Sequence, residues 1–254
     1  MAREHRHPPS AACLSASMRD LGYSLETAIA DLIDNSISAG ADRIDIICDV
    51  SDELPLVVIL DNGKGMTEGE LLAAMRHGTD NPRQHRSPKD LGRFGLGLKT
   101  ASFSQCRSLT VVSTSNASIC GAEWNLDRID AADDWILSIL DEADIQVLPY
   151  VDRLGQHGTA VIWRELDRML EDEVGDRRQE IVNEKLEVVG RHLALVFHRF
   201  LSGEVKGHPR IALTINGRPI AAFDPFCRKN PATQVLPEEI VRICVAEVRL
   251  QAYV

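Results

Sequence analysis

Residues 24–50 read SLETAIADLIDNSISAGADRIDIICDV and predict an amphipathic helix followed by a strand. Ser24 is a residue type that commonly caps a helix N-terminus, and Gly40 stands where the helix should stop. An apolar stripe at helical spacing is formed by Leu25, Ile29, Leu32, Ile33 and Ile37. We therefore expect a helix over 24–39 and a strand over 43–50.

Further patterns continue along the chain. The run 56-LVVIL-60 is apolar throughout, which indicates a strand buried on both faces. The capping box Thr67-x-x-Glu70 predicts the start of a second helix, and 169–202 has a long helical pattern. Strand patterns also cover 109–114, 119–124, 135–140, 158–163, 210–215, 218–223 and 244–254. Asn216-Gly217 predicts a hairpin, and the pattern that runs to the last residue suggests a chain cut from a longer protein.

Composition limits the class of protein. The chain has 254 residues, 44% of them apolar, which is enough to bury a core. Its formal net charge of −10 argues against a body that coats nucleic acid. No apolar run approaches a membrane span of about 18 residues, and the N-terminal residues lack the apolar segment of a secretory signal. Six dispersed cysteines without a C-x-x-C pair indicate reduced thiols, so we expect a cytoplasmic protein without membrane association.

Asp31 and Asn35 form the first candidate site. They are four residues apart on the predicted helix, which places them about 40° apart around its axis, on the face away from the apolar stripe. An amide oxygen can bind Mg²⁺, and a neighbouring carboxylate can accept a proton from water. An ordinary solvated face would carry the same residues, so this pair does not decide the function by itself.

A second candidate site is Asp61-x-Gly63-x-Gly65, at the end of the buried strand. A carboxylate fixed at a strand end can accept a hydrogen bond from an amine, and glycines let the backbone approach a planar ring closely. An ordinary Asp-Asn-Gly turn explains these residues equally well.

A glycine-rich stretch, 92-GRFGLGLKTAS-102, follows a polar segment over 78–91 that has the length and composition of a functional loop such as a lid. Glycines that expose backbone N–H groups before a helical segment suit a phosphate. The stretch is not a P-loop, because Leu98 separates Gly97 from Lys99, and no strand precedes it as a dinucleotide fingerprint requires. A phosphate loop of another kind and a flexible hinge both remain open.

Taken in order, these motifs and Gly158-Thr159 at a strand start resemble the GHKL ATPase superfamily, which includes DNA gyrase B subunits, heat-shock chaperones, histidine kinases, MutL and MORC proteins. The likeness spans roughly residues 20–165, and 31–46 and 92–103 are most similar to MORC ATPases and their bacterial relatives. It implies a two-layer α/β (α+β) sandwich, in which helices cover one face of a mixed, mainly antiparallel sheet.

The resemblance also implies a domain organisation. Residues 190–226 are similar to the start of the transducer domain that follows the ATPase domain in these groups. We therefore expect an N-terminal arm over 1–19, an ATP-binding domain over 20–168, and a partial, truncated transducer-like domain over 169–254.

The resemblance assigns roles to individual residues. Asn35 would bind Mg²⁺, and Asp61 would bind the adenine amino group, with Thr159 helping through a water. Asp31 stands where these ATPases usually carry a glutamate that deprotonates the attacking water. Since aspartate is one methylene shorter and small misplacements can cost about 100-fold, we predict slow hydrolysis. The other cofactor-binding positions, beside the ring or in the phosphate-binding lid, are Gly63, Gly65, Met66, Gly92, Gly95, Leu96, Gly97, Leu98 and Lys99.

The implied activity is Mg-ATP binding and slow hydrolysis, coupled to ordering of the lid over 78–97 and to homodimerisation in the ATP-bound state. Aspartate at position 31 keeps a second function open, a nucleotide sensor with little turnover that regulates a DNA-repair or defence partner. A third is a DNA-clamping module, although the net charge of −10 means that regions outside this sequence would have to bind the DNA.

Overall fold

The computed structural model describes residues 5, 9–20, 22–51, 55–76, 97–170, 177–244 and 246–254. Its α-helices are α1 (Ala11–Arg19), α2 (Leu25–Ser38), α3 (Glu68–Met75), α4 (Gly97–Gln105), α5 (Leu126–Ala132), α6 (Glu142–Gln146), α7 (Arg178–Val196) and α8 (His198–Ser202), with 3₁₀ turns η1 (Val151–Arg153) and η2 (Asp167–Met169). Its strands are β1 (Arg43–Asp49), β2 (Leu56–Asp61), β3 (Ser108–Ser115), β4 (Ser118–Asn125), β5 (Leu137–Leu140), β6 (Gly158–Arg164), β7 (Ala212–Ile215), β8 (Arg218–Pro219), β9 (Glu239–Ile243) and β10 (Ala246–Leu250).

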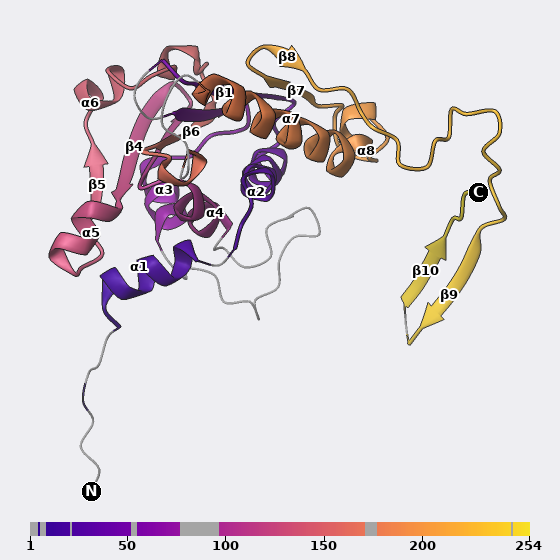
Figure 1. Ribbon diagram of the computed structural model, residues 1–254, viewed down its shortest axis with the longest axis horizontal. Coiled ribbons are helices and arrows are strands. Elements are labelled where there is room, and N and C mark those ends of the chain that lie inside the picture. The colour runs from indigo at the N-terminus through magenta and orange to yellow at the C-terminus, as the bar shows by residue number, and fades with distance from the viewer. Residues whose placement is uncertain are drawn as a thin grey trace, which may run out of the picture.

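Within the described residues, eight strands form one twisted sheet in the order β5-β4-β3-β6-β2-β1-β7-β8 (Figure 1). Neighbouring strands pair antiparallel, except that β7 runs parallel to β1. This arrangement confirms the predicted mixed, mainly antiparallel sheet.

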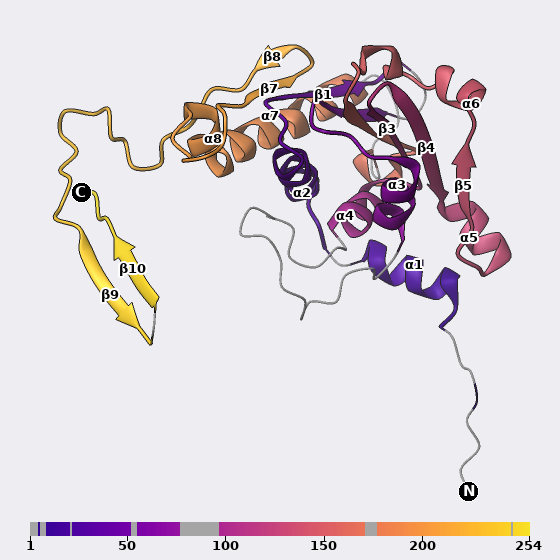
Figure 2. The same ribbon diagram turned by 180° about the vertical axis from the view of Figure 1, so that it is seen from behind.

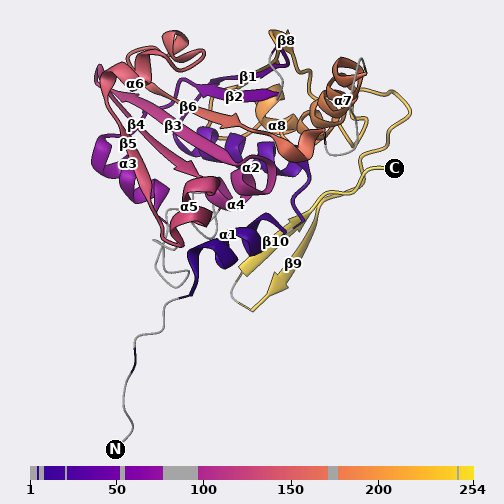
Figure 3. The same cartoon turned by 60° about the vertical axis from the view of Figure 1, so that its left-hand side comes forward.

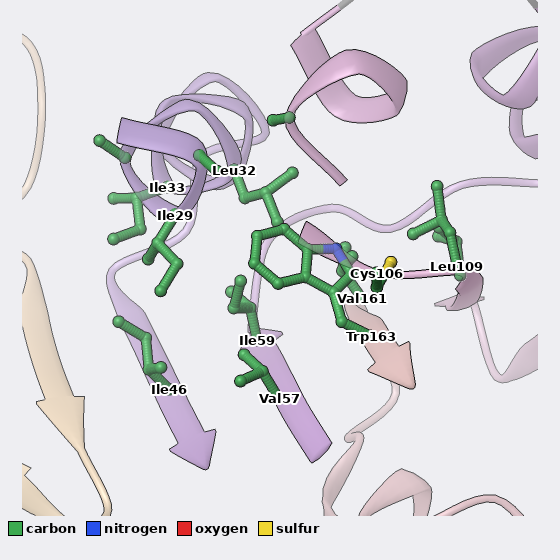
Figure 4. Close-up of a cluster of buried hydrophobic side chains, with 14 of the residues drawn as sticks. Ile29, Leu32, Ile33, Ile46, Val57, Ile59, Cys106, Leu109, Val161 and Trp163 are labelled. Atoms are coloured by element: carbon green, nitrogen blue, oxygen red, sulfur yellow. The ribbon is translucent and has the colours of Figure 1, made fainter. Parts of the chain in front are cut away.

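The main core lies between the sheet and the helices packed on one of its faces, with α2 and α4 on that side of the strands (Figure 3). Figure 4 shows the fully buried indole of Trp163 with Leu32 of α2 on one side and Ile59 of β2 on the other. A smaller apolar cluster fills the opposite face, where Ile145 of α6 and Val151 cover the central strands. β2 is therefore buried on both faces, as its unbroken apolar sequence predicts.

Local signals place the helix ends correctly. The Ser24 side chain accepts a hydrogen bond from the backbone N–H of Thr27, and α2 starts at the next residue. In α3 both hydrogen bonds of the predicted capping box between Thr67 and Glu70 are present. Capping depends on residues within one turn of each other, which explains why the sequence predicts it well.

Other elements differ from the sequence patterns. The predicted strand over 218–223 is only the two residues of β8, with one further hydrogen bond to β7 from the Ile220 N–H to the Leu213 carbonyl oxygen at 2.8 Å. The helical pattern over 169–202 divides into η2, α7 and α8. β9 has no counterpart among the predicted strands, and it pairs only with β10 in a two-stranded sheet that stands away from the main body (Figures 1 and 2).

Residues beyond 168 take part in the main sheet and core. β7 pairs with β1, and Val189 and Leu193 of α7 belong to the same apolar cluster as α2. Near the N-terminus, Nη2 of buried Arg19 donates to both carboxylate oxygens of Asp167 at 2.7 Å. These contacts attach α1 to η2. Among the described helices, none is both long and apolar enough to cross a membrane.

Candidate functional site

A row of polar side chains crosses three central strands at one end of the core. Asp61 of β2 is directly opposite Thr159 of β6, and Thr159 is directly opposite Ser113 of β3. Residues directly opposite each other in antiparallel strands point to the same face of a sheet. Here it is the helix-covered face, because Ile59 and Val161, two residues away on the same strands, lie in the main core.

The Asp61 carboxylate is held by hydrogen bonds at both oxygens. Its Oδ1 accepts the backbone N–H of Gly63 at 2.8 Å, and its Oδ2 accepts the hydroxyl of Ser36 from α2 at 2.9 Å. Burial raises the pKa of Asp61, while hydrogen bonds from Gly63, Ser36 and Thr159 oppose that shift. Because a carboxylate has about four acceptor positions, this group is fixed in orientation and can still accept a hydrogen bond from a ligand amine.

The turn after Asp61 packs too tightly for side chains at its glycines. Gly65 has φ +68°, and a Cβ there would lie 1.9 Å from the carbonyl oxygen of Thr114. At Gly63 a Cβ would lie 2.9 Å from the Cβ of Ala39. The protein's own packing therefore requires both glycines, and their predicted approach to a planar ring remains a prediction.

The middle and C-terminal part of α2 carry Asp31, Asp34 and Asn35 in addition to buried Ser36. Burial and the negative charge of Asp31 raise the pKa of Asp34 to about 6. Asn35 is exposed on the last turn and Asp31 is half-buried. Burial, the charge of Asp31 and a hydrogen bond to its carboxylate raise the pKa of Tyr23, just before the helix.

The start of α4 lies against Asp31. A Cβ on Gly97 would be 3.5 Å from Oδ2 of Asp31, in ordinary van der Waals contact. The structure therefore brings together Asp31 and the first residue of the helix that follows the glycine-rich stretch. These two positions are 66 residues apart in the sequence, from 31 to 97.

Lys99 points its ammonium group at α3. The side chain is 2% exposed, and Nζ donates to the carbonyl oxygens of Ala74 at 2.6 Å and Arg76 at 2.9 Å. A cation there also interacts favourably with the helix dipole. Lys99 thus ties α4 to the C-terminus of α3 through two of its three N–H donors, and the phosphate contact predicted for it remains a prediction.

The other predicted residues divide into two groups. The Met66 N–H donates to Ser113, and Leu98 packs against the main core. Gly92, Gly95 and Leu96 lie outside the described residues, as does the polar segment over 78–91, so their roles in a phosphate-binding lid remain predictions.

Two serines at the site were not predicted from the sequence. Ser36 follows Asn35 directly, and that adjacency was the one available signal for it. Ser113 gave no signal, because its place beside Thr159 depends on the pairing of β3 with β6 across 46 residues of sequence.

The donor set at Asn35 fits magnesium. Mg²⁺ binds oxygen ligands, keeps several waters, and is usually held by one or two protein groups together with substrate phosphates. The exposed Asn35 amide, near the carboxylates of Asp31 and Asp34, offers that chemistry. Among the described residues, no group of three or more His, Cys, Asp or Glu side chains could hold a metal ion by itself.

The fold and this site together define an ATPase-type α/β sandwich. The sheet is covered by helices on one face, a half-buried carboxylate stands at a strand end, and an Asp/Asn pair lies on the covering helix. Residues 23–159 match the family described as histidine kinase-, DNA gyrase B- and HSP90-like ATPases. Because the match covers more than half of the chain, the chain belongs to this family, which confirms the resemblance to GHKL ATPases.

A curated relative supports the MORC-like branch. The chain is 37% identical over 79 residues to ATPase MORC2B of Mus musculus. The aligned segment is 30% of this chain and 8% of the mouse protein, so the chain spans a small part of that relative.

Proposed function

We propose that this chain binds Mg-ATP and hydrolyses it slowly. The observation that carries the proposal is the half-buried Asp61 carboxylate, oriented by Gly63 and Ser36 and placed beside Thr159. A fixed anionic acceptor suits the amino group of adenine and repels the oxygen that guanine carries at the same ring position. Membership of an ATPase family supports the same nucleotide.

The phosphate end of the nucleotide would lie near α2 and α4. A bound Mg²⁺ would neutralise phosphate charge, and the amide oxygen of Asn35 would be its protein ligand. The first turn of α4, beside Asp31, presents backbone N–H groups that suit a phosphate. Asp31 would orient the attacking water and accept its proton.

The proposal extends to ordering of a lid over 78–97 and to ATP-gated homodimerisation. Its support is the polar sequence of 78–91 and the likeness to MORC ATPases, since residues 77–96 lie outside the described part of the chain. Such order–disorder transitions are a recurring way to couple nucleotide binding to assembly.

The decisive experiment is calorimetry of ATP binding with and without Mg²⁺. We expect Mg²⁺ to tighten wild-type binding about tenfold, which is about 1.4 kcal/mol. Asn35→Ala should lose most of that increment and keep the magnesium-free affinity, since only the metal ligand is removed. Asn183→Ala, an asparagine on α7, is the matched control and should bind like wild type. A wild-type protein without magnesium-dependent affinity for ATP would refute the proposal.

Asp31 should determine turnover without determining affinity. We expect Asp31→Asn to lower steady-state phosphate release about 100-fold, because an amide cannot accept the proton of water, while ATP affinity changes little. Glu26→Gln is the control, since Glu26 lies on the same helix but about 140° around its axis from Asp31. Equal, near-zero rates for wild type and Asp31→Asn would favour the sensor with little turnover.

A further inference from the structure

β5 forms one edge of the eight-stranded sheet, and no described segment pairs with its outer side. It lies at the margin of the molecule in Figures 1 and 2, with α5 beyond one end and α6 beyond the other. Alternate residues of an edge strand direct their N–H and C=O groups away from the sheet, where another strand can pair with them. The sequence of β5, LSIL, contains neither a proline nor a charge that would block such pairing.

Contacts with neighbouring residues hold β5 in place. The ring of Trp135, just before the strand, packs edge-on against Trp124 with the ring centroids 5.9 Å apart. Nη1 of Arg128 donates to the Ser138 hydroxyl at 2.6 Å, and Leu140 packs against the smaller apolar cluster. The outer edge is therefore preformed, so a segment that pairs with it would not have to order it first.

The exposed side chains at this edge are apolar. Ile139 is directly opposite Ala122 of β4 on the helix-covered face, yet it is 57% exposed because the sheet ends there. Ile136, just before the strand, is 46% exposed. Directly opposite residues of paired strands contact each other, so an added strand would cover Ile139 with a side chain of its own.

Carboxylates flank both ends of the strand. Residues 127–144 contain seven acidic residues and one basic residue. Asp134 precedes β5, and Asp141, Glu142 and Asp144 follow it. All four are exposed, and none of them forms an ion pair with another described residue. The edge therefore carries negative charge that the described part of the fold does not neutralise.

A small cavity lies beside the end of β5. Its volume is about 190 Å³, its apolar lining includes Ile119, Ile145 and Val151, and two of its lining residues are Glu142 and Asp152. The methylene groups of a lysine can lie on such an apolar surface while the ammonium group reaches the carboxylates. The cavity thus suits a basic side chain that follows the paired segment.

A second copy of this chain does not fit the same edge. Two copies of β5 paired edge to edge would bring their flanking carboxylates together, and like charges on paired strands are destabilising. Carboxylates that served only to prevent such pairing would explain the charge. They would not explain why the strand between them is uncharged and exposes Ile139.

We infer that the outer edge of β5 is a docking site for an extended peptide segment of a partner protein, with apolar residues between basic ones. The segment would add a further strand to the sheet through main-chain hydrogen bonds. Its apolar side chains would cover Ile139, and its lysine or arginine side chains would reach the carboxylates at the two ends. The edge would bind such a segment whether or not the chain binds ATP.

The test measures binding of the fluorescently labelled peptide KKTVTVTVKK to the whole chain by anisotropy. We expect a dissociation constant of about 100 μM at low salt that rises about fivefold at high salt, because salt screens exposed charges. KKTVPVTVKK should bind about tenfold more weakly, since proline lacks an N–H and interrupts an added strand. EETVTVTVEE should show no binding. Hydrogen exchange of amides within 137–140 should slow when KKTVTVTVKK binds.

Variants of the chain localise the binding. Asp134→Asn/Glu142→Gln should weaken the affinity for KKTVTVTVKK about fivefold through lost charge, and Ile139→Thr should weaken it similarly through lost apolar contact. Glu184→Gln/Glu187→Gln is the matched control, because it also removes two exposed carboxylates, from α7. It should bind the peptide like wild type.

Several results would overturn the inference. One is no binding of KKTVTVTVKK at about 1 mM, and another is equal affinity for KKTVTVTVKK and KKTVPVTVKK. Unchanged hydrogen exchange in residues 137–140, or wild-type affinity in Asp134→Asn/Glu142→Gln, would place the peptide elsewhere. A dimer in sedimentation that Ile139→Lys abolishes would mean that the edge binds a second copy of the chain and not a partner peptide.

Discussion

Replacing Asp61 with asparagine should abolish most ATP binding while the protein remains folded. We expect the dissociation constant to rise about 100-fold or more, because the charged acceptor is lost and the amide NH₂ would face the adenine amine, donor against donor. Calorimetry of ATP binding, with chemical denaturation of the same samples, measures both effects.

The fold should tolerate this change because the remaining contacts can be satisfied. The asparagine Oδ1 can accept the Gly63 N–H, and its NH₂ can donate to Ser36, whose own proton can turn to the Leu32 carbonyl oxygen 3.2 Å away. Burial raises the pKa of Asp61 in the folded protein, so its ionised form costs folding free energy at neutral pH, and a neutral amide removes that cost. We therefore expect an unfolding midpoint at or above the wild-type value.

Asp45→Asn is the control for this substitution. Asp45 lies on β1 and accepts the Thr214 hydroxyl at 2.8 Å, much as Asp61 accepts that of Ser36. It should leave ATP affinity unchanged. Wild-type affinity in Asp61→Asn would contradict the assignment of the adenine-binding carboxylate.

Gly65→Ala should damage both stability and ATP binding. The backbone there has φ +68°, which costs an L-residue about 1–2 kcal/mol. The added Cβ would also lie 1.9 Å from the Thr114 carbonyl oxygen, and no side-chain rotation can relieve a clash with backbone. We expect a total loss of about 3 kcal/mol or more in unfolding free energy, measured by chemical denaturation. The turn must then move away from β3, and ATP affinity should fall with it.

Gly40→Ala distinguishes the cost of a positive φ from the cost of a backbone clash. Gly40 has a similar φ of +81°, but no atom lies within 4 Å of a Cβ built there. It should therefore lose only the backbone cost of about 1–2 kcal/mol and keep ATP affinity. Equal losses for the two variants would mean that the close approach of Gly65 to Thr114 is not what constrains the turn.

Local sequence patterns predicted the parts of the site that depend on local geometry. Helical spacing and the cap at Ser24 predicted the helix that carries Asp31 and Asn35, and the apolar strand predicted where Asp61 stands. These features depend on residues within one or two turns, or on alternation within one strand, so they are visible in the sequence. The order of the motifs was enough to indicate the ATPase family.

The other features of the site depend on contacts between distant parts of the chain. The position of β6 between β3 and β2 places Ser113, Thr159 and Asp61 in one row, although they come from three separate parts of the chain. A shift of one residue in that register would turn the row to the other face of the sheet. The burial of Lys99 against α3 was equally invisible, because the sequence shows a lysine beside glycines and not the carbonyl groups that receive it.

The sequence alone thus predicted the elements that carry Asp31, Asn35 and Asp61, and it missed Ser36 and Ser113. The tertiary structure alone decided which of them meet, because strand register and helix docking follow from the packing of the whole core and not from any local stretch.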